Sequence, residues 1–290
     1  MSIPSSQGSE SFTPTASPNE AAGLEISIIV PFNRRSPFLD PCARAIQDRV
    51  WALPDVEVLF IDTLSSDAAA ALLGRNFPGF RILRAERRNP YAARNLGAGV
   101  ARGRILAFTD ADCAIDPDWI SAIRESFSRG AAMATGPVIP AQSASRLLQS
   151  LHACENLRIK EMCSSGGSRV AYTYTNNLAI DAALFRALGG FDDSRPRGGD
   201  SDFLRRAQAR NRNLPFRFHS GMGVMHLEMK SLRTWLAKKF LYGRSGTAGR
   251  SPPAGLPHSD KSEPIRNTAL LLALGLGRAA YLAGRLSRRI

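Results

Sequence analysis

Two aspartates, Asp110 and Asp112, carry the clearest chemical signal in this sequence of 290 residues. They follow an apolar run at 104–109 that is rich in strand-forming residues. Because residues i and i+2 of an extended chain point the same way, both carboxylates can reach one spot beyond the strand end. Open α/β sheets bind ligands there, and Mg²⁺ is typically held by one or two carboxylates together with substrate phosphates. The pair predicts a metal site; the alternative is an acidic turn.

The run at 104–109 is one of several strand patterns that alternate with helical ones. This alternation predicts an α/β fold, with a mostly parallel sheet and helices on both faces. After about residue 135 the alternation becomes irregular. We expect strands at 25–30, 56–61, 80–83, 104–109, 172–180 and 215–218, and helices at 37–50, 67–73, 90–102, 117–129, 143–163, 181–188, 200–212 and 231–243.

Polar groups accompany the other strand ends of the first half. Asp62 ends the second strand pattern, where a carboxylate can accept a hydrogen bond from a nucleobase or cap the next helix. Arg94 lies in the Ala-rich helical pattern before the metal strand, and a guanidinium suits phosphates or a base edge. The alternative for Arg94 is a solvated surface arginine.

Two further groups lie downstream. Asp200 and Asp202 follow two glycines at the start of a helical pattern, where a carboxylate can act as a general base or as a helix cap. His226 follows a Gly-Met-Gly-Val-Met loop. Its imidazole is a better ligand for Mn²⁺ than for Mg²⁺, but a single histidine can equally be structural.

In order and spacing, these motifs resemble the family 2 glycosyltransferases, which have the GT-A fold and its Rossmann-like nucleotide-binding sheet. The resemblance covers roughly residues 25–245. It implies inverting transfer of a sugar from a nucleotide donor. The motifs that carry it are Val30-Pro31-Phe32, Phe60-Ile61-Asp62, Ala93-Arg94-Asn95, Asp110-Ala111-Asp112, Gly189-Gly190-Phe191-Asp192, Gly198-Gly199-Asp200-Ser201-Asp202 and Val224-Met225-His226.

The resemblance implies a donor site along the strand ends. The nucleotide would lie across Pro31, Phe32 and Arg94, and Asp62 would contact the uracil of a UDP-sugar. Family members usually continue after this aspartate with Asp or Asn and then Gly. This sequence has Thr63-Leu64 instead, which leaves the base less certain.

The resemblance also implies a metal site. Asp112 would ligate Mn²⁺ or Mg²⁺ directly, and Asp110 would bind the ribose or a metal-bound water. His226 matches a position where some relatives complete the metal or diphosphate site.

The third implied role is the general base. Asp200 matches the carboxylate that takes the proton of the acceptor hydroxyl, and Asp202 is a neighbour that could share or replace this role. The family usually has Glu before this aspartate, whereas this sequence has Gly199.

The net charge of +13 is concentrated near the C-terminus. Residues 230–290 hold 12 Lys or Arg and 2 Asp or Glu, and the preceding residues hold 26 and 23. Such asymmetry favours nucleic acid or an anionic membrane as partner. No nucleic-acid-binding motif is present, so we expect a membrane surface and no nucleic acid.

Two C-terminal segments could form that membrane contact. The pattern at 231–243 is an amphipathic helix that would lie on a membrane or pack on the catalytic domain, with its basic residues in solvent. Residues 267–284 are almost wholly apolar apart from Arg278, and we expect a membrane-surface or re-entrant helix.

The expected organisation has three parts. A disordered tail spans 1–24, which lacks the pattern of a signal peptide. A GT-A domain spans 25–245, with a donor half at 25–134 and an acceptor half at 135–245. A linker and membrane-associating helix span 246–290. Four scattered cysteines indicate neither a zinc site nor a disulfide framework, as in a reducing cytoplasm.

Two alternative functions remain open. A sugar-nucleotide pyrophosphorylase also combines a nucleotide-binding sheet with acidic metal ligands, although it typically has a Gly-rich phosphate loop where this sequence has Pro31-Phe32-Asn33. A membrane-bound scaffold without turnover would fit the altered positions Thr63, Leu64 and Gly199. We expect a carbohydrate, lipid-linked or other hydroxyl acceptor.

Overall fold

The computed structural model describes residues 23–33, 37–64, 67–164, 170, 172–195, 197–244 and 268–287. Almost all of the tail expected at 1–24 lies outside these residues. Most of the Gly/Ser-rich segment at 164–170 and the whole of the linker at 245–264 also lie outside them.

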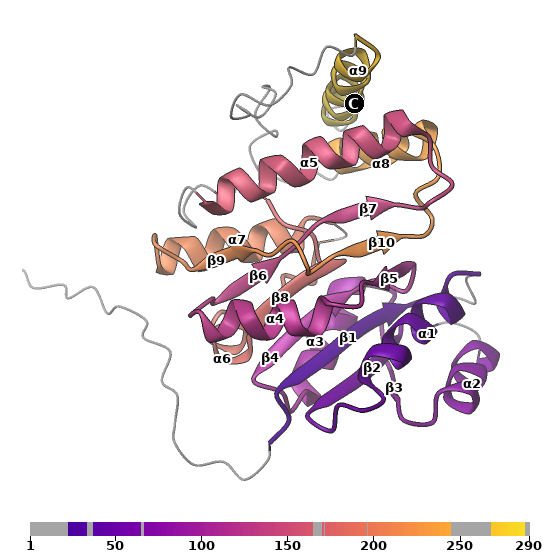
Figure 1. Cartoon of the computed structure of the whole chain (residues 1–290), viewed down its shortest axis with the longest axis vertical. Helices are drawn as coiled ribbons and strands as arrows, with labels where there is room; N and C mark the ends of the chain where they lie inside the picture. Colours follow the sequence, from indigo (N-terminus) through magenta and orange to yellow (C-terminus); the bar gives the residue numbers. More distant parts are fainter. Residues whose placement is uncertain are drawn as a thin grey trace, which may run out of the picture.

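A seven-stranded sheet forms the centre of the molecule, in the order β3-β2-β1-β4-β8-β6-β9 (Figure 1). The first four of these strands are parallel, and β8 alone runs antiparallel to both of its neighbours. The mostly parallel sheet expected from the sequence is therefore confirmed. The strands are β1 (Ile26–Phe32), β2 (Val56–Asp62), β3 (Arg81–Arg84), β4 (Ile105–Thr109), β6 (Met133–Thr135), β8 (Asn177–Asp181) and β9 (Phe216–Phe218).

Helices cover both faces of this sheet, as expected. Because side chains alternate along a strand, Ile28 and Val30 of β1 join one hydrophobic cluster, while Ile29 joins the other. The first cluster is closed by α1 (Leu39–Val50), α2 (Asp67–Asn76) and α4 (Trp119–Ser128). The second is closed by α3 (Pro90–Val100), α6 (Ala182–Ala187) and α7 (Gly199–Arg210).

A second sheet of three strands has the order β5-β10-β7. Its strands are β5 (Cys113–Ile115), β7 (Val138–Pro140) and β10 (Val224–His226). The antiparallel register pairs His226 with Cys113, the residue that follows Asp112. This small sheet therefore brings a histidine from late in the sequence beside the aspartate pair.

Three helices lie at the end of the molecule opposite β3 and α2 (Figure 1). They are α5 (Arg146–Ser164), α8 (Leu232–Arg244) and α9 (Thr268–Leu286). Trp235 and Leu236 of α8 join a cluster with Leu148 and Leu151 of α5 and Ala273 of α9. Of the two interpretations of 231–243, the structure shows the packed helix.

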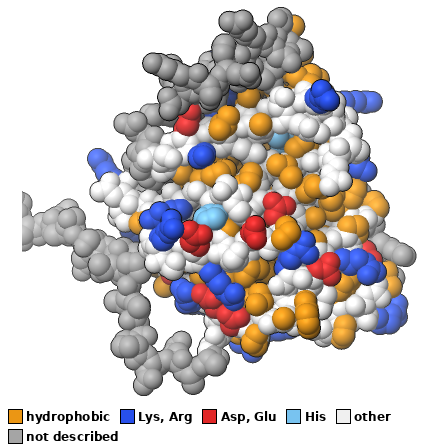
Figure 2. All heavy atoms as spheres, in the orientation of Figure 1, with side chains coloured by type: hydrophobic (Ala, Val, Ile, Leu, Met, Phe, Trp, Pro, Cys, Tyr) orange, Lys and Arg blue, Asp and Glu red, His pale blue; other side chains and the backbone are white. Residues whose placement is uncertain are grey.

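The basic residues of α8 differ from expectation. Lys238 and Lys239 are only 30% and 22% exposed, and they pair with Glu228 and Glu155 instead of lying free in solvent. No helix among the described residues is long and apolar enough to cross a bilayer. On the face drawn in Figure 2, acidic and basic side chains are intermixed.

Several expected boundaries were wrong. Pro31 does not stop β1 but lies within it, opposite Ile61 of β2. A proline is tolerated there because β1 pairs with β4 only as far as Ile29, which leaves an open edge at Pro31. The strand expected at 172–180 begins only at Asn177, and the short strands β5, β6, β7 and β10 were not predicted.

The packing of α3 on the sheet generates a stability prediction. A Cβ on the buried Gly97 would lie 2.6 Å from Cγ2 of Ile29, whereas a Cβ on Gly99 in the same helix meets nothing within 4 Å. Gly97→Ala should lower the free energy of unfolding by about 1–3 kcal/mol through overpacking. Gly99→Ala should raise it by about 0.5–1 kcal/mol because alanine favours helix. Urea unfolding measures both, and equal stabilities would contradict this seating of α3.

Candidate active site

Arg94 is held in place by the way α3 begins. The Asn89 side chain caps the helix, accepting hydrogen bonds from the backbone N–H groups of Tyr91 at 2.7 Å and Ala92 at 3.2 Å. Pro90, at the first helical position, needs no such bond. Arg94 follows one turn later and is 3% exposed. Its guanidinium lies over the Tyr91 ring, 5.6 Å from the centroid, and forms an ion pair with Asp110.

The two aspartates lie just beyond β4, as expected. The side chain of Asp110 is 34% exposed and that of Asp112 is 24% exposed. Burial and the neighbouring Asp110 carboxylate raise the pKa of Asp112 above its usual range. Two neighbouring carboxylates are stabilised by a nearby positive charge, and the Arg94 guanidinium forms its ion pair with Asp110 only.

His226 approaches Asp112 from β10. Its Nδ1 lies 3.6 Å from Oδ2 of Asp112 and is buried without a hydrogen-bond partner. The ligand atoms of Asp112, Cys113 and His226 all lie within 4.8 Å of one another. A buried imidazole nitrogen beside a carboxylate could bind a divalent cation in the tautomer that leaves this nitrogen unprotonated. Burial raises the pKa of the Cys113 thiol, and sulfur suits Mg²⁺ or Mn²⁺ less well than a carboxylate does.

Lys238 of α8 contacts the other nitrogen of this imidazole. Its Nζ lies 2.9 Å from Nε2 of His226 and 3.3 Å from Glu228. Because an ammonium only donates, this contact places the ring proton on Nδ1, and Nδ1 could bind a cation only after that proton moved to Nε2 and Lys238 turned away. Burial and the Lys238 charge lower the pKa of His226 to about 4, so the ring is neutral. The sequence placed Lys238 only on the basic side of an amphipathic helix.

Asp200 lies in the first turn of α7. Its Oδ1 accepts a hydrogen bond from the Ser201 backbone N–H at 2.8 Å, and the Tyr91 hydroxyl lies 3.5 Å away. Burial raises the pKa of Asp200, although Ser201 and the Arg94 charge oppose the shift. A carboxylate that holds its proton more tightly than usual is also a stronger base.

Arg94, the two aspartates and Asp200 surround one cavity of about 370 Å³, whereas the predicted His226 is not among its lining residues. The cavity brings together residues that lie far apart in the sequence, so most of the predicted site converges. The cavity is lined by the predicted Pro31, Phe32, Arg94, Asp110, Asp112 and Asp200, and by Tyr91, Thr175, Arg197 and Tyr242, which the sequence analysis did not single out.

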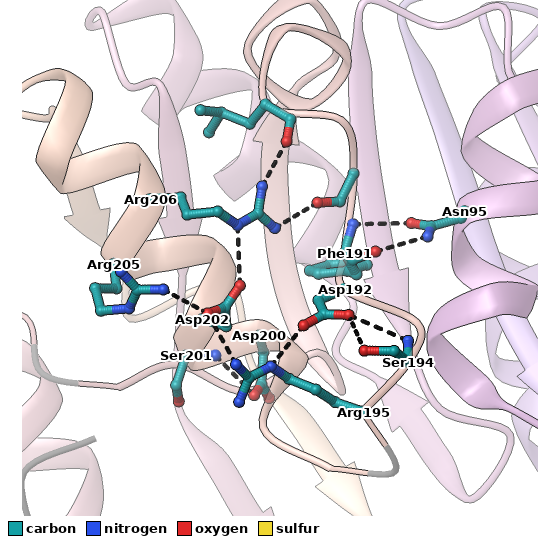
Figure 3. Close-up of polar contacts among 12 residues, drawn as sticks. Asn95, Phe191, Asp192, Ser194, Arg195, Asp200, Ser201, Asp202, Arg205 and Arg206 are labelled. Carbon is teal, nitrogen blue, oxygen red and sulfur yellow. Dashed lines mark hydrogen bonds and ion pairs between the residues drawn. The ribbon is translucent and has the colours of Figure 1, made fainter. Parts of the chain in front are cut away.

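Asp202 does not line this cavity. Its carboxylate, 8% exposed, accepts hydrogen bonds from Arg205 at 2.7 Å and Arg206 at 2.9 Å, and Arg195 lies 3.7 Å away (Figure 3). Arg206 also donates to the backbone carbonyls of Leu188 and Gly190, so the cluster ties α7 to the preceding turn. These contacts among the described residues indicate that Asp202 anchors the structure, and they do not fit its expected role as a second general base.

Comparison with known proteins decides the family. The glycosyl transferase family 2 model matches residues 27–187, more than half of the chain. This chain belongs to glycosyl transferase family 2. The family 2 chain is 28% identical over 210 residues to the pre-mycofactocin glycosyltransferase of Mycobacterium tuberculosis, covering 67% of this chain and 43% of that protein. It is 26% identical over 197 residues to glycosyltransferase AglE of Haloferax volcanii, covering 66% of this chain and 64% of that protein.

Solved structures share the fold. The mannosyltransferase PcManGT of Pyrobaculum calidifontis, in complex with GDP-Man and Mn²⁺, has a TM-score of 0.58 at 16% identity, covering 91% of this chain and 72% of that chain. S. aureus TarS in complex with UDP-GlcNAc has a TM-score of 0.56 at 14% identity, covering 78% and 68%. The GT-A fold expected of this family 2 glycosyltransferase is thereby confirmed.

This chain departs from the usual family 2 pattern at two places. Gly199 replaces the expected Glu, and a Cβ there would lie 3.0 Å from the Tyr91 ring, which fills the space. Leu64 has φ 60°, a left-handed conformation that glycine adopts without strain. Leu64 stands where the family usually has Gly, and its own backbone has a conformation that suits glycine. Asp62 itself is 2% exposed and does not line the cavity.

The contrast between Asp200 and Asp202 predicts opposite effects on stability. Asp202→Asn should lower the free energy of unfolding by about 1–3 kcal/mol, because it removes the charge that the arginines surround. The Arg205 and Arg206 hydrogen bonds lower the pKa of Asp202 despite its burial, so this stabilisation is present at neutral pH and is lost as pH falls through that lowered pKa.

Asp200→Asn should leave stability at neutral pH unchanged or higher, since a neutral amide removes the burial penalty of the carboxylate. Thermal unfolding of both variants at neutral and acidic pH measures the difference. A larger loss for Asp200→Asn than for Asp202→Asn would contradict these environments.

Proposed function

We propose that this protein is an inverting, metal-dependent glycosyltransferase that moves a sugar from a nucleotide donor to an acceptor hydroxyl. The observation that carries the proposal is the cavity itself. Arg94, Asp110 and Asp112 lie on its wall together with Asp200, which comes from a different helix. A cation and diphosphate site and a separate carboxylate base are the two components that inverting transfer requires.

The donor side would use the strand ends of the first half. Arg88, Arg94 and Arg197 are the cavity-lining cations among the described residues, and guanidinium groups suit the donor phosphates. Pro31 and Phe32 offer an apolar floor for the nucleotide. Asp112 would hold the divalent cation, joined by Nδ1 of His226 in the tautomer that leaves this nitrogen unprotonated, with Asp110 supporting them through the ribose or a metal-bound water. When bound, the cation neutralises charge on the leaving diphosphate.

The acceptor side would use Asp200. The attacking hydroxyl loses its proton as its oxygen bonds to the anomeric carbon and the nucleoside diphosphate departs. Asp200 takes that proton, and its raised pKa makes it better suited to do so than an ordinary aspartate. The arginines around Asp202 hold α7, and with it the position of Asp200.

The donor is proposed as a nucleotide sugar, with UDP-sugars as the first candidates. TarS is solved with UDP-GlcNAc and PcManGT with GDP-Man and Mn²⁺, which supports the class of donor and a divalent cation. A contact between Asp62 and uracil would need this buried carboxylate to become accessible, since it lies outside the cavity.

Membership of family 2 favours transfer over the pyrophosphorylase alternative. The inactive-scaffold alternative is disfavoured because Asp200 and both aspartates of the Asp110-Ala111-Asp112 motif line the cavity. The chain spans less than half of the mycobacterial relative, so its acceptor, whether carbohydrate, lipid-linked or another hydroxyl compound, is a proposal by class only. A peripheral location on the inner face of a cell membrane, without nucleic acid, stays a prediction.

Turnover tests the roles of the two carboxylates. With UDP-sugars and Mn²⁺, Asp200→Asn should lower kcat by about 10²–10⁴-fold, as expected for loss of a general base. Asp112→Asn should lower activity strongly and weaken Mn²⁺ dependence, because it removes a ligand. Asp118→Asn, an exposed carboxylate that does not line the cavity, is the matched control.

A thermal-shift measurement separates these roles. Asp200→Asn should still show a Mn²⁺-dependent rise in Tm with the donor, since ligand binding stabilises the native state. Asp112→Asn should lose most of that rise. Full turnover in either variant would reject its assignment, and a wild-type protein that binds donor without turnover would support the scaffold.

The raised pKa of Asp200 predicts the pH profile. The base must be ionised, so kcat/KM should fall as pH drops through that raised pKa, at a higher pH than an ordinary aspartate would give. Steady-state rates at saturating Mn²⁺, measured from about pH 4 to about pH 9, define this acid limb of the profile. An acid limb at the usual aspartate pKa would argue against a buried base.

A further inference from the structure

The helix α9 buries one side and exposes the other. Ala273 is 2% exposed and joins the cluster with α5 and α8, and Leu274 packs partly against it. Gly277 faces Trp235 of α8 so closely that a Cβ there would lie 2.2 Å from the indole ring. The side of α9 that carries Ala273 and Gly277 is therefore fixed on the protein.

The exposed side carries four leucines. Leu272 and Leu286 are 64% exposed, Leu276 is 54% exposed and Leu282 is 41% exposed. At about 100° per residue these four lie within roughly a third of the helix circumference. This arc points away from the packed side. We call these four side chains the leucine face.

Such a surface is unusual on a monomeric protein, where large exposed apolar patches mark interaction sites. The leucine face extends along most of a helix of 19 residues, or about 28 Å. The segment that joins α8 to α9, residues 245–267, contains only Leu256 and Ile265 as large aliphatic residues. The partner must therefore be apolar and broad.

Charge narrows the choice of partner. Arg278 is exposed and lies at the edge of the leucine face, about 40° around the helix from Leu282. Over residues 230–290, Lys and Arg outnumber Asp and Glu by 12 to 2. A leucine face bordered by Arg278, in a segment this rich in Lys and Arg, is the pattern of a helix that lies in the headgroup region of an anionic membrane.

We propose that α9 docks the protein on an anionic phospholipid bilayer, with the leucine face in the boundary between headgroups and acyl chains. The helix would lie flat, since its other side is held by Trp235. The same α8 that carries Trp235 lines the cavity with Tyr242, so docking would bring the cavity within about one or two helix diameters of the lipid. The proposal makes the predicted membrane location more specific and rests on that location, but it does not depend on glycosyltransferase turnover.

Vesicle co-sedimentation of the full chain tests the proposal. Vesicles of phosphatidylcholine mixed with phosphatidylglycerol should bind the protein, and vesicles of phosphatidylcholine alone should bind it less. The double variant Leu272→Ser, Leu276→Ser should weaken partitioning by at least about tenfold, because it removes apolar area from the contact. Arg278→Gln should reduce the preference for anionic vesicles and its sensitivity to salt.

Leu157→Ser is the matched control, since Leu157 is 45% exposed on α5, away from the leucine face. It should bind vesicles like the wild type. All variants should keep the wild-type Tm and UDP-sugar turnover in detergent-free solution, so loss of docking is separable from loss of catalysis. Unchanged binding by the double variant would overturn the proposal. So would a wild-type dimer that the double variant dissociates, because a second copy would then cover the leucine face.

Discussion

The ion pair between Arg94 and Asp110 is the constraint on which the site depends. Arg94 is almost fully buried, so its charge must be compensated, and the strand end of β4 supplies the carboxylate. The same guanidinium lies over Tyr91, whose hydroxyl lies beside Asp200. One buried arginine thus connects the aspartate pair with the carboxylate on α7. The close seating of α3 on β1 at Gly97 places that arginine.

The local part of this arrangement could be predicted from the sequence. The strands that precede Asp62 and Asp110 are short apolar runs, and their ends locate the carboxylates. The strands β5, β7 and β10 were missed because each has three residues and forms only through pairing with distant partners. The same limit applies to Lys238, which reaches His226 only because α8 packs on α5.

Asp200 and Asp202 show why a motif cannot assign roles by itself. They lie two residues apart in one helix turn, and the sequence could not separate them. Three arginines surround the Asp202 carboxylate, and two of them follow it on the same helix. Among the described residues no arginine forms an ion pair with Asp200, which faces the cavity instead. The difference is one of surroundings, which include Tyr91 in the space left by Gly199.

The antiparallel strand β8 lies between β4 and β6, so the two expected halves of the domain complete one sheet. A fragment ending near residue 134 would leave the apolar strand β4 as an open edge, with unpaired backbone groups along its length. By contrast, the outer strand β3 carries arginines at both of its ends. The donor half therefore does not form an independent folding unit. Strand β4, which ends just before the aspartate pair, is held in register by β8, about seventy positions later in the chain.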